Sequence, residues 1–486
     1  MVTLRLEKIR LQTFQEPSPF ADCMKLLMTC FLRPCSPLFA GILLAWPLMS
    51  PAAVYEVGTG KSLATIGEVP WEALRPGDTV RIHWRAQPYH EKWVLCFRGT
   101  QEQPITISGV PGPKGQLPVI DGQDATKRPV LSYWGEERGV LKIGGANKPA
   151  DRMPAHILIE NLDIRGARRP FTFAGRKGAT AYSKDAASVI VEKADHLVLR
   201  NLTLHDSGNG LMISAQSSNV RVEGCHIYDN GNPGSITEHN AYTECNGIVF
   251  EGNHFGPLRK GCLGINLKDR SAGLVVAYNW IEGGSRQLDL VDATGNKALN
   301  ASPEYRRTLV YGNVLIENED GGNNQIVHYG GDSTKTAGYR KGVLHFYHNT
   351  VVSHRTKTTV LFRPSTPEEK VECHGNILHV TVPGMKLSLM GGSGTLTLGK
   401  NWLTSGWVKA VEELKLDLKT LEPSLEGKEP GFVSLKKLDL TLLPDSPCKG
   451  AGATFAAELP KPAKRYVKHQ KLEELATGTP LNLGGL

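Results

Sequence analysis

Short segments of alternating apolar and polar residues recur along the chain at a nearly constant interval. Examples are residues 196–199 and 273–276, which are typical of half-buried β-strands. Each recurrence contains an apolar residue, one or two spacers, an Asn and further apolar residues. The motif occurs with its asparagine at Asn161, Asn201, Asn253, Asn279, Asn313, Asn349, Asn376 and Asn401. A degenerate copy at Cys225 fills the interval between Asn201 and Asn253.

The interval between copies is about 24 to 28 residues where nothing is inserted, which lies in the range of solenoid repeats. Strand-length segments at a fixed period indicate that each coil stacks on the preceding one. An Asn at each corner tolerates a left-handed backbone, and its amide can bond to the Asn one coil away. The pattern therefore predicts an all-β fold, a single-stranded right-handed parallel β-helix.

The repeat divides the chain into regions. Residues 54–403 are predicted to form the β-helix, with an N-terminal cap that covers the open end of the core. The pattern decays afterwards, so residues 404–454 are expected to close the last coil. Residues 455–486 are basic and contain prolines, and we expect them to form an irregular tail that packs along the helix. Long insertions on a β-helix commonly wall a groove on one face.

Residues 1–53 are interpreted as an N-terminal extension and signal peptide. Lys25 and Arg33 precede the apolar run 37–46, and small residues follow at 50–53. The run is short for a bilayer span, so no stable membrane insertion is expected after cleavage, although a membrane anchor is the alternative. The predicted location is secreted, periplasmic or on the cell surface, with the start codon at Met1 or Met24.

The net charge of the chain indicates which kinds of partner it favours. The formal net charge is +8, from 56 basic and 48 acidic residues, which favours acidic partners. An acidic polysaccharide is preferred to anionic lipid, and nucleic acid ranks last because no nucleic-acid motif is present. Six cysteines follow residue 53 without metal-ligand spacing. Buried free thiols are favoured over a disulfide framework.

Several stretches resemble a broad bacterial family of secreted right-handed parallel β-helix proteins. They are residues 76–80, 239–242, 267–272, 278–282, 287–292 and 310–313. The resemblance covers roughly residues 55–455 and extends to a fold group that includes pectate, alginate and chondroitinase-B-like lyases and mannuronan epimerases. In alginate and chondroitin lyases of this group a Lys lies on one coil and an Arg on the next. Here Lys268 is followed by Asp269 and Arg270, and Arg286 is out of register with that pattern.

The densest group of candidate functional side chains is predicted on three successive coils. Counting back from the corner asparagines places Tyr242 beside Lys268, with coils about 4.8 Å apart. The same count aligns Asn240 with Asn266, and the next strand, residues 288–292, aligns Asp289 with Asn266, which extends a polar ladder. Alternation of apolar residues in 265–269 predicts that Asn266 and Lys268 point outward.

These residue types suit β-elimination on a uronic acid. The reaction needs a group that neutralises the carboxylate, a base for the C5 proton and an acid for the leaving oxygen. Lys268 is the predicted base if a neighbouring cation depresses its pKa, and Tyr242 is an acid or base. The substrate carboxylate is predicted to be neutralised by His239, Arg270 or Arg286, or by a calcium ion held by Asp289 and Asp292.

Further residues are predicted to bind the substrate. They are Asn240 and Asn266 on these coils, and Asn324, His328 and Tyr329 one coil later. The preferred interpretation is a lyase or epimerase acting on an acidic polysaccharide. The alternatives are a non-catalytic glycan-binding or adhesin-type β-helix, in which these groups form only surface ladders and ion pairs, and a glycoside hydrolase that would need paired carboxylates.

Overall fold

The computed structural model describes residues 51–293, 295–319, 321–412, 416–467, 470–476, 478 and 480–486. The chain divides into two compact units, residues 1–51 and 52–486, and the second holds every element described below. The signal-peptide prediction therefore falls almost entirely outside the described residues. Within the described ranges, no helix is long and apolar enough to span a bilayer.

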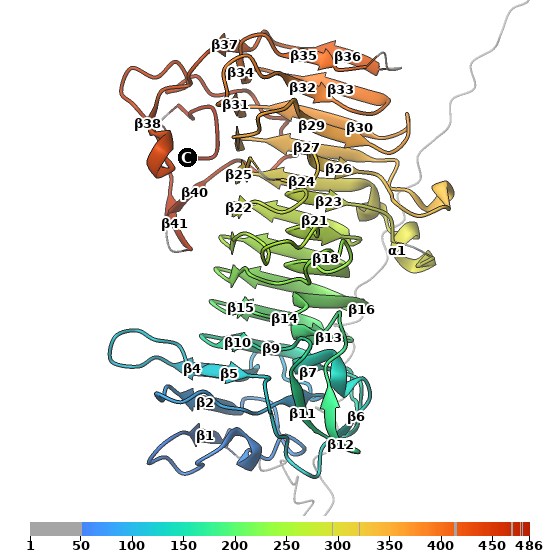
Figure 1. The fold of residues 1–486 in the computed structure, drawn as a ribbon, viewed down its shortest axis with the longest axis vertical. Coiled ribbons are helices and arrows are strands. Elements are labelled where there is room, and N and C mark those ends of the chain that lie inside the picture. The colour runs from blue at the N-terminus through green and yellow to red at the C-terminus, as the bar shows by residue number, and fades with distance from the viewer. Residues whose placement is uncertain are drawn as a thin grey trace, which may run out of the picture. The chain divides into compact units, whose positions relative to one another are not determined.

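Residues 52–486 form a right-handed parallel β-helix, which confirms the predicted fold class. Successive coils pair in parallel, and Figure 1 shows the strands stacked one above another. One face, called the site face below, consists of β3 (Trp93–Leu95), β7 (Gly139–Ile143), β13 (Ala187–Val191), β20 (Leu267–Asp269), β23 (Leu288–Leu290), β26 (Gln325–Tyr329), β29 (Thr359–Pro364), β32 (Leu387–Met390) and β35 (Val408–Ala410).

A second face follows each site-face strand along the chain. It consists of β1 (Val54–Val57), β2 (Thr79–His83), β4 (Ile105–Val110), β9 (Ala155–Glu160), β14 (Asp195–Arg200), β21 (Ala272–Ala277), β24 (Arg307–Tyr311), β27 (Val343–Tyr347), β30 (Lys370–His374), β33 (Gly394–Leu398) and β36 (Leu416–Thr420). Two long strands, β16 (Asn209–Glu223) and β18 (Ala241–Glu251), run through both faces and join them into one 22-stranded sheet.

The third face is a separate 11-stranded sheet. It consists of β5 (Val119–Asp121), β10 (Asp163–Arg165), β15 (Thr203–His205), β17 (His226–Ile227), β19 (His254–Phe255), β22 (Trp280–Glu282), β25 (Val314–Glu317), β28 (Thr350–Ser353), β31 (Ile377–Val380), β34 (Trp402–Thr404) and β37 (Leu425–Gly427). Parallel strands thus continue past residue 403, because β34 to β37 complete a further coil.

Four antiparallel pairs lie outside the coils. They are β6 (Ser132–Tyr133) with β8 (Ala146–Lys148), β11 (Thr172–Gly175) with β12 (Gly178–Ala181), β38 (Phe432–Ser434) with β39 (Asp439–Leu442), and β40 (Lys464–Val467) with β41 (Lys471–Glu474). The helix α1 (Lys297–Ala301) and the 3-10 turns Ile66–Glu68, Glu136–Arg138, Pro303–Arg306, Thr336–Gly338 and Leu435–Lys437 occupy connecting loops.

The corner asparagines form the predicted ladder of side-chain hydrogen bonds, but the left-handed backbone conformation does not lie at the buried asparagines themselves. Asn279 accepts a hydrogen bond from Asn253 Nδ2 at 2.9 Å, which confirms that these residues stack on adjacent coils. Equivalent bonds continue through Asn313, Asn349, Asn376 and Asn401. The left-handed residue is the one before the ladder asparagine at five of the six positions, for example Gly252 and Tyr278, the exception being Asn401. A buried Asn is therefore selected for its amide rather than for its φ angle.

Asn161 and Asn201 belong to a different position of the coil. They have left-handed φ angles of 59° and 47° and share an exposed hydrogen bond of 2.6 Å. Strand register aligns Asn201 with Gly252 rather than with Asn253. The residues that align with Asn253 are therefore Leu202 in the coil of Asn201 and Cys225 in the coil after it. Cys225 has its backbone N–H bonded to Asn253 Oδ1 at 2.9 Å, and it ends the ladder.

Less regular chain segments pack against the N-terminal part of the β-helix and along its side. Trp71, stacked 5.2 Å from Trp93, is fully buried in the N-terminal part of the core. In the tail, Tyr347 donates to Pro460 O at 2.9 Å and Lys464 pairs with Glu251 at 2.9 Å. The tail therefore packs along the coils as predicted. All six described cysteines are free thiols, as predicted.

Candidate functional site

A lateral column of polar residues crosses four neighbouring strands of the site face. Tyr242 on β18 pairs in register with Lys268 on β20, Lys268 with Asp289 on β23, and Asp289 with His328 on β26. Neighbouring strands lie about 4.8 Å apart, so consecutive side chains on one face touch. This confirms that Tyr242 and Lys268 are neighbours. Asp289 is two positions from its predicted alignment, opposite Lys268 rather than Asn266.

The column forms the floor of a cleft with a volume of about 610 Å³. His239, Arg270, Arg286 and Asp332 line the cleft together with the column. Ile236 and Leu263, which are 66% and 46% exposed, contribute apolar side chains from the loops beside it. A cleft with polar groups converging below an apolar rim is suited to a sugar ring, which has both hydroxyl edges and C–H faces.

Lys268 lies between two carboxylates. Its Nζ contacts Asp289 Oδ2 and Asp332 Oδ2, the latter at 2.6 Å. Lys268 points out of the core into the cleft, as predicted, but the neighbouring groups leave the residue only 9% exposed. Two carboxylates at this range stabilise an ammonium group, whereas a general base must be a neutral amine. The arrangement therefore favours an electrostatic role for Lys268.

Arg270 and Tyr242 form the second contact of the cleft. Arg270 Nε donates to the Tyr242 phenolic oxygen at 3.0 Å, and Nη2 lies 2.9 Å from Asp332 Oδ1. Burial disfavours the charged guanidinium, but Tyr242 and Asp332 outweigh burial and raise the pKa of Arg270. The guanidinium therefore holds the Tyr242 phenolic oxygen in place at the edge of the cleft.

His239 lines the cleft as a neutral imidazole. Burial, reinforced by Lys268, lowers the pKa of His239 to about 3. Its Nδ1 accepts from the Ile265 backbone N–H at 3.0 Å, so the proton resides on Nε2. Among the described residues Nε2 has no hydrogen-bond partner. His239 thus presents an N–H donor to the cleft.

Asp289 is the buried anchor of the column. His328 Nδ1 lies 2.7 Å from Asp289 Oδ1, and Arg286 Nη1 lies 3.4 Å from the same oxygen. Burial would raise the pKa of Asp289, but His328 and Lys268 hold it below its ordinary value. The His328 Nε2 atom lies 2.9 Å from Ser365 Oγ. That hydroxyl also bonds to Gly331 N and O, so Ser365 fixes the imidazole.

An inserted loop after β26 supplies Asp332, which the periodic pattern could not assign. The loop is anchored by Arg340, a fully buried residue that donates to Val291 O at 3.0 Å and Ser271 O at 2.8 Å. Arg340 Nη2 also pairs with Asp269 Oδ1 at 3.1 Å. Asp292 Oδ1 accepts from the Asp332 backbone N–H at 2.8 Å. These contacts position the Asp332 carboxylate over Lys268 and Arg270.

Two predicted substrate-binding residues are buried instead. Asn240 and Asn266 are both 0% exposed. Asn240 Nδ2 donates to Asn266 Oδ1 at 2.6 Å, and Asn266 Nδ2 donates to Gly283 O at 2.7 Å. The polar ladder between them is confirmed, but it points inward, because the amides satisfy backbone carbonyls where the chain turns between faces. The prediction that Asn240 and Asn266 bind substrate is wrong.

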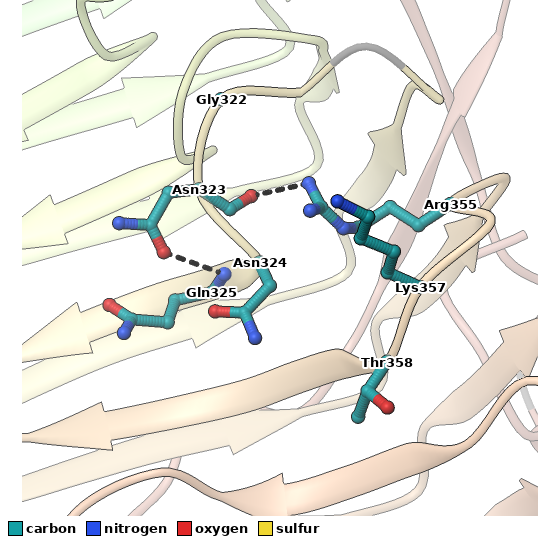
Figure 2. Close-up of a pocket in the computed structure, with 7 residues that line it drawn as sticks. All are labelled: Gly322, Asn323, Asn324, Gln325, Arg355, Lys357 and Thr358. Carbon is teal, nitrogen blue, oxygen red and sulfur yellow. Dashed lines mark hydrogen bonds between the residues drawn. The ribbon is translucent and has the colours of Figure 1, made fainter.

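Two further predicted substrate-binding residues do not line the cleft. Tyr329 is 0% exposed and belongs to the hydrophobic core, because it follows His328 on the strand and faces the opposite side. Asn324 lines a separate hollow next to the cleft, shown in Figure 2. Of the five predicted substrate-binding residues, only His328 lines the cleft.

Asp289 and Asp292 do not fit a shared calcium site. Both oxygens of Asp289 contact cationic side chains, and Asp292 Oδ1 accepts from the backbone amides of Asp332 and Ser333. Within the described part of the chain, no group of three His, Cys, Asp or Glu residues is arranged to hold a metal ion. Calcium prefers six to eight oxygen ligands, which Asp289 and Asp292 do not provide in this arrangement.

Comparison with known proteins supports the fold. Residues 155–363 match the family described as right handed beta helix region. An alginate lyase from Paenibacillus sp. str. FPU-7 is similar in structure, with 15% identity and a TM-score of 0.45 over 66% of this chain and 93% of the lyase. The pectate lyase Pel9A has 11% identity and a TM-score of 0.48 over 90% of this chain and 96% of its own.

A GH136 lacto-N-biosidase from Eubacterium ramulus has 12% identity and a TM-score of 0.40, covering 77% of this chain and 68% of that chain. No curated protein matches the chain in sequence. These TM-scores lie below 0.5, so the fold rests on the family match and the strand pairing, and the chemistry of the cleft rests on its own residues.

Proposed function

We propose that the protein acts on an acidic, uronate-containing polysaccharide and begins its reaction by removing the C5 proton of a uronate. The observation that carries the proposal is the 3.0 Å hydrogen bond from Arg270 Nε to the Tyr242 oxygen, in an open cleft with further cations. A tyrosine held in this position can act as a base toward carbon and can return the proton as an acid.

The proposed reaction is an elimination. The Tyr242 phenolate takes the C5 proton, and the electrons of the C5–H bond form the C4–C5 double bond. The C4–O bond to the neighbouring sugar breaks, and its oxygen takes a proton from the Tyr242 phenol. An epimerase would share the first step and then deliver a proton to the opposite face of C5. Both outcomes pass through an enolate-like charge on the uronate carboxylate, which the cleft must stabilise.

Arg286 and His239 are suited to receive that carboxylate. Both line the cleft, the Arg286 side chain is 22% exposed, and His239 presents its Nε2–H. Lys268 and Arg270 add positive charge below them. Lys268 acts in this proposal by holding Asp289 and Asp332 in place and by stabilising developing negative charge, rather than by taking the proton.

Glycoside hydrolysis is less well supported. Both Asp289 Oδ2 and Asp332 Oδ2 contact the Lys268 ammonium group, which brings two carboxylates together. A hydrolase also needs one carboxyl group with a raised pKa to act as general acid. The pKa of Asp289 is lowered and its two oxygens are engaged by cations, so it cannot donate a proton to a leaving group.

We also propose that the protein is exported and works outside the cytoplasm. The apolar run 37–46 after Lys25 and Arg33 resembles a signal peptide. We expect export, with the mature chain beginning near Ala53 or Val54. Mass spectrometry of the secreted protein measures this start, and an intact 24–44 segment in secreted material would contradict it.

The test is to incubate purified protein, in buffer with a chelator, with alginate, polygalacturonate and glycosaminoglycan uronates. The expected result is ultraviolet absorbance from an unsaturated uronate on at least one polymer, lost in Tyr242→Phe. If the protein binds these polymers but forms no product from any of them, the non-catalytic glycan-binding alternative is favoured. Release of reducing ends without unsaturation would favour hydrolysis.

A further inference from the structure

A second hollow lies beside the cleft and holds cations that the proposed chemistry does not use. It has a volume of about 490 Å³ and is lined by Gly322, Asn323, Asn324, Gln325, Arg355, Lys357 and Thr358 (Figure 2). Asn323 lines both the hollow and the cleft. The loops that form the hollow precede β26 and β29, the two strands that follow β23 in the sheet. The hollow is therefore displaced along the helix axis from β23 by one to two coil spacings, about 5 to 10 Å.

Arg355 is held rigidly with part of its guanidinium available. The residue is 8% exposed, and its Nη1 donates to Gly321 O at 2.6 Å, Asn323 O at 2.7 Å and Glu317 Oε1 at 3.0 Å. Among the described residues its Nη2 atom has no hydrogen-bond partner. A fixed guanidinium with donors free is a preorganised site for an oxyanion.

Lys357 adds a second positive charge. The side chain is exposed, and Lys357 lines the same hollow as Arg355 (Figure 2). No carboxylate of the described residues pairs with Lys357. Two cations that share one space repel each other unless an anion lies between them, so the pair is suited to a ligand with a negative charge.

The buried partner of Arg355 compensates its charge only in part. Glu317 is 0% exposed, and burial raises its pKa to about 7 although Arg355 opposes the shift. At neutral pH a substantial fraction of this carboxyl group is therefore protonated. The hollow keeps positive charge, and the side-chain amides of Asn323, Asn324 and Gln325 at its wall can bond sugar hydroxyls.

We infer that this hollow is a second anion subsite, which binds the carboxylate of another acidic sugar while the reacting uronate occupies the cleft. The inference rests on the proposed function for the identity of the polymer. A row of cations then follows the axis of the β-helix, with Arg270 and Arg286 at the cleft and Arg355 and Lys357 beyond it. A polymer with a negative charge on successive sugars matches such a row, whereas a neutral polymer does not.

The experiment measures binding without turnover, by calorimetry in the Tyr242→Phe background. The probes are mannuronate and galacturonate oligomers, each as dimer and hexamer, with a neutral cello-hexamer and its sulfated derivative. Lys357→Glu and Arg355→Lys are introduced separately, because Arg355→Ala removes three hydrogen bonds and risks misfolding. Lys114→Glu, an exposed lysine on the loop after β4, is the control with the same charge change.

The expected result is that Lys357→Glu weakens hexamer binding by about tenfold or more, the loss typical of one charge-assisted hydrogen bond. Arg355→Lys should weaken it in the same direction, while dimer binding and the Lys114→Glu control stay unchanged. Tighter binding of the sulfated neutral hexamer than of the uronate hexamer would reassign the subsite to sulfate and overturn the carboxylate assignment.

Unchanged hexamer affinity in both variants would also overturn the inference. Equal losses for dimer and hexamer would contradict a separate subsite. Failure of the proposed function is distinguishable, because it would appear as no unsaturated product from wild-type protein while charge-dependent hexamer binding persisted.

Discussion

Arg270 on one coil donates a hydrogen bond of 3.0 Å to the phenolic oxygen of Tyr242 on the coil before it. The bond exists because β18 and β20 pair in register at Tyr242 and Lys268, which brings Arg270 two residues later under the ring. Arg270 is fixed in turn by Asp332 and by the Asp292 carbonyl. A cation that cannot turn away keeps the phenolic oxygen polarised, and the proposed proton transfer depends on this.

Removal of the Tyr242 hydroxyl should abolish turnover with little effect on folding. Tyr242→Phe leaves the ring in place and removes only the group that moves the proton, so we expect a loss of about 100-fold or more in kcat. Tyr228→Phe is the matched control, since Tyr228 is a partly buried tyrosine stacked on His226 at 4.2 Å, next to the third face. Equal activity of Tyr242→Phe and wild type would contradict the assignment.

Lys268 should matter to stability as well as to activity. Lys268→Ala leaves Asp289 and Asp332 without their shared cation, and loss of one partner of a buried ion pair typically costs about 3 kcal/mol or more. Asp332 is partly exposed, so we expect roughly 2 kcal/mol, measured by urea unfolding. Lys114→Ala, at an exposed loop position, should change stability by less than about 0.5 kcal/mol. Equal midpoints for the two variants would refute the buried-pair interpretation.

The buried asparagine ladder should stabilise the coils more than the exposed pair does. Asn313→Ala removes bonds to Val276 O at 2.9 Å and to Asn349 Oδ1 at 2.9 Å, and leaves buried backbone groups without partners. The expected loss is about 2 to 3 kcal/mol. Asn201→Gly removes the exposed bond to Asn161 while tolerating the left-handed φ of 47°, so thermal unfolding should show a much smaller shift. A larger shift for Asn201→Gly would reverse the ranking.

Glu317 predicts a pH dependence of stability. Its pKa is about 7 in the folded protein against 4.5 ordinarily. Between these values the folded state binds more protons than the unfolded state, so the free energy of unfolding falls as pH rises. From about pH 5 to about pH 8 the wild type should lose roughly 2 kcal/mol relative to Glu317→Gln. Parallel stability curves for the two proteins would show that Glu317 ionises normally.

The sequence was sufficient for the fold and for the centre of the column. Alternation around Leu267 and the repeat interval placed Lys268 beside Tyr242, because strand pairing between uninterrupted coils preserves the count. The alignment failed at Asp289, because the spacing between paired residues falls from 26 (Tyr242 to Lys268) to 21 (Lys268 to Asp289). It failed at Asn240 and Asn266 because residues at a turn between faces satisfy backbone groups instead of following the alternation.

Residues from inserted loops were not predictable by periodicity. Asp332 and Ser365 enter the site from segments with no repeat signal, and Arg340, which anchors one of them, is an arginine that hydrophobic patterning treats as exposed. The left-handed position before the ladder asparagines 253 to 376 was also missed, although Gly252, Gly312 and Gly375 carried that signal in the sequence.

The most direct test of the central claim is proton NMR of a polyuronate incubated with the protein in deuterated water. Wild-type protein is predicted to produce either the vinyl signal of an unsaturated uronate or loss of the C5 proton signal through deuterium exchange, and Tyr242→Phe neither. The first result identifies a lyase and the second an epimerase. Retention of every C5 proton across the polymers that the protein binds would contradict C5 proton removal.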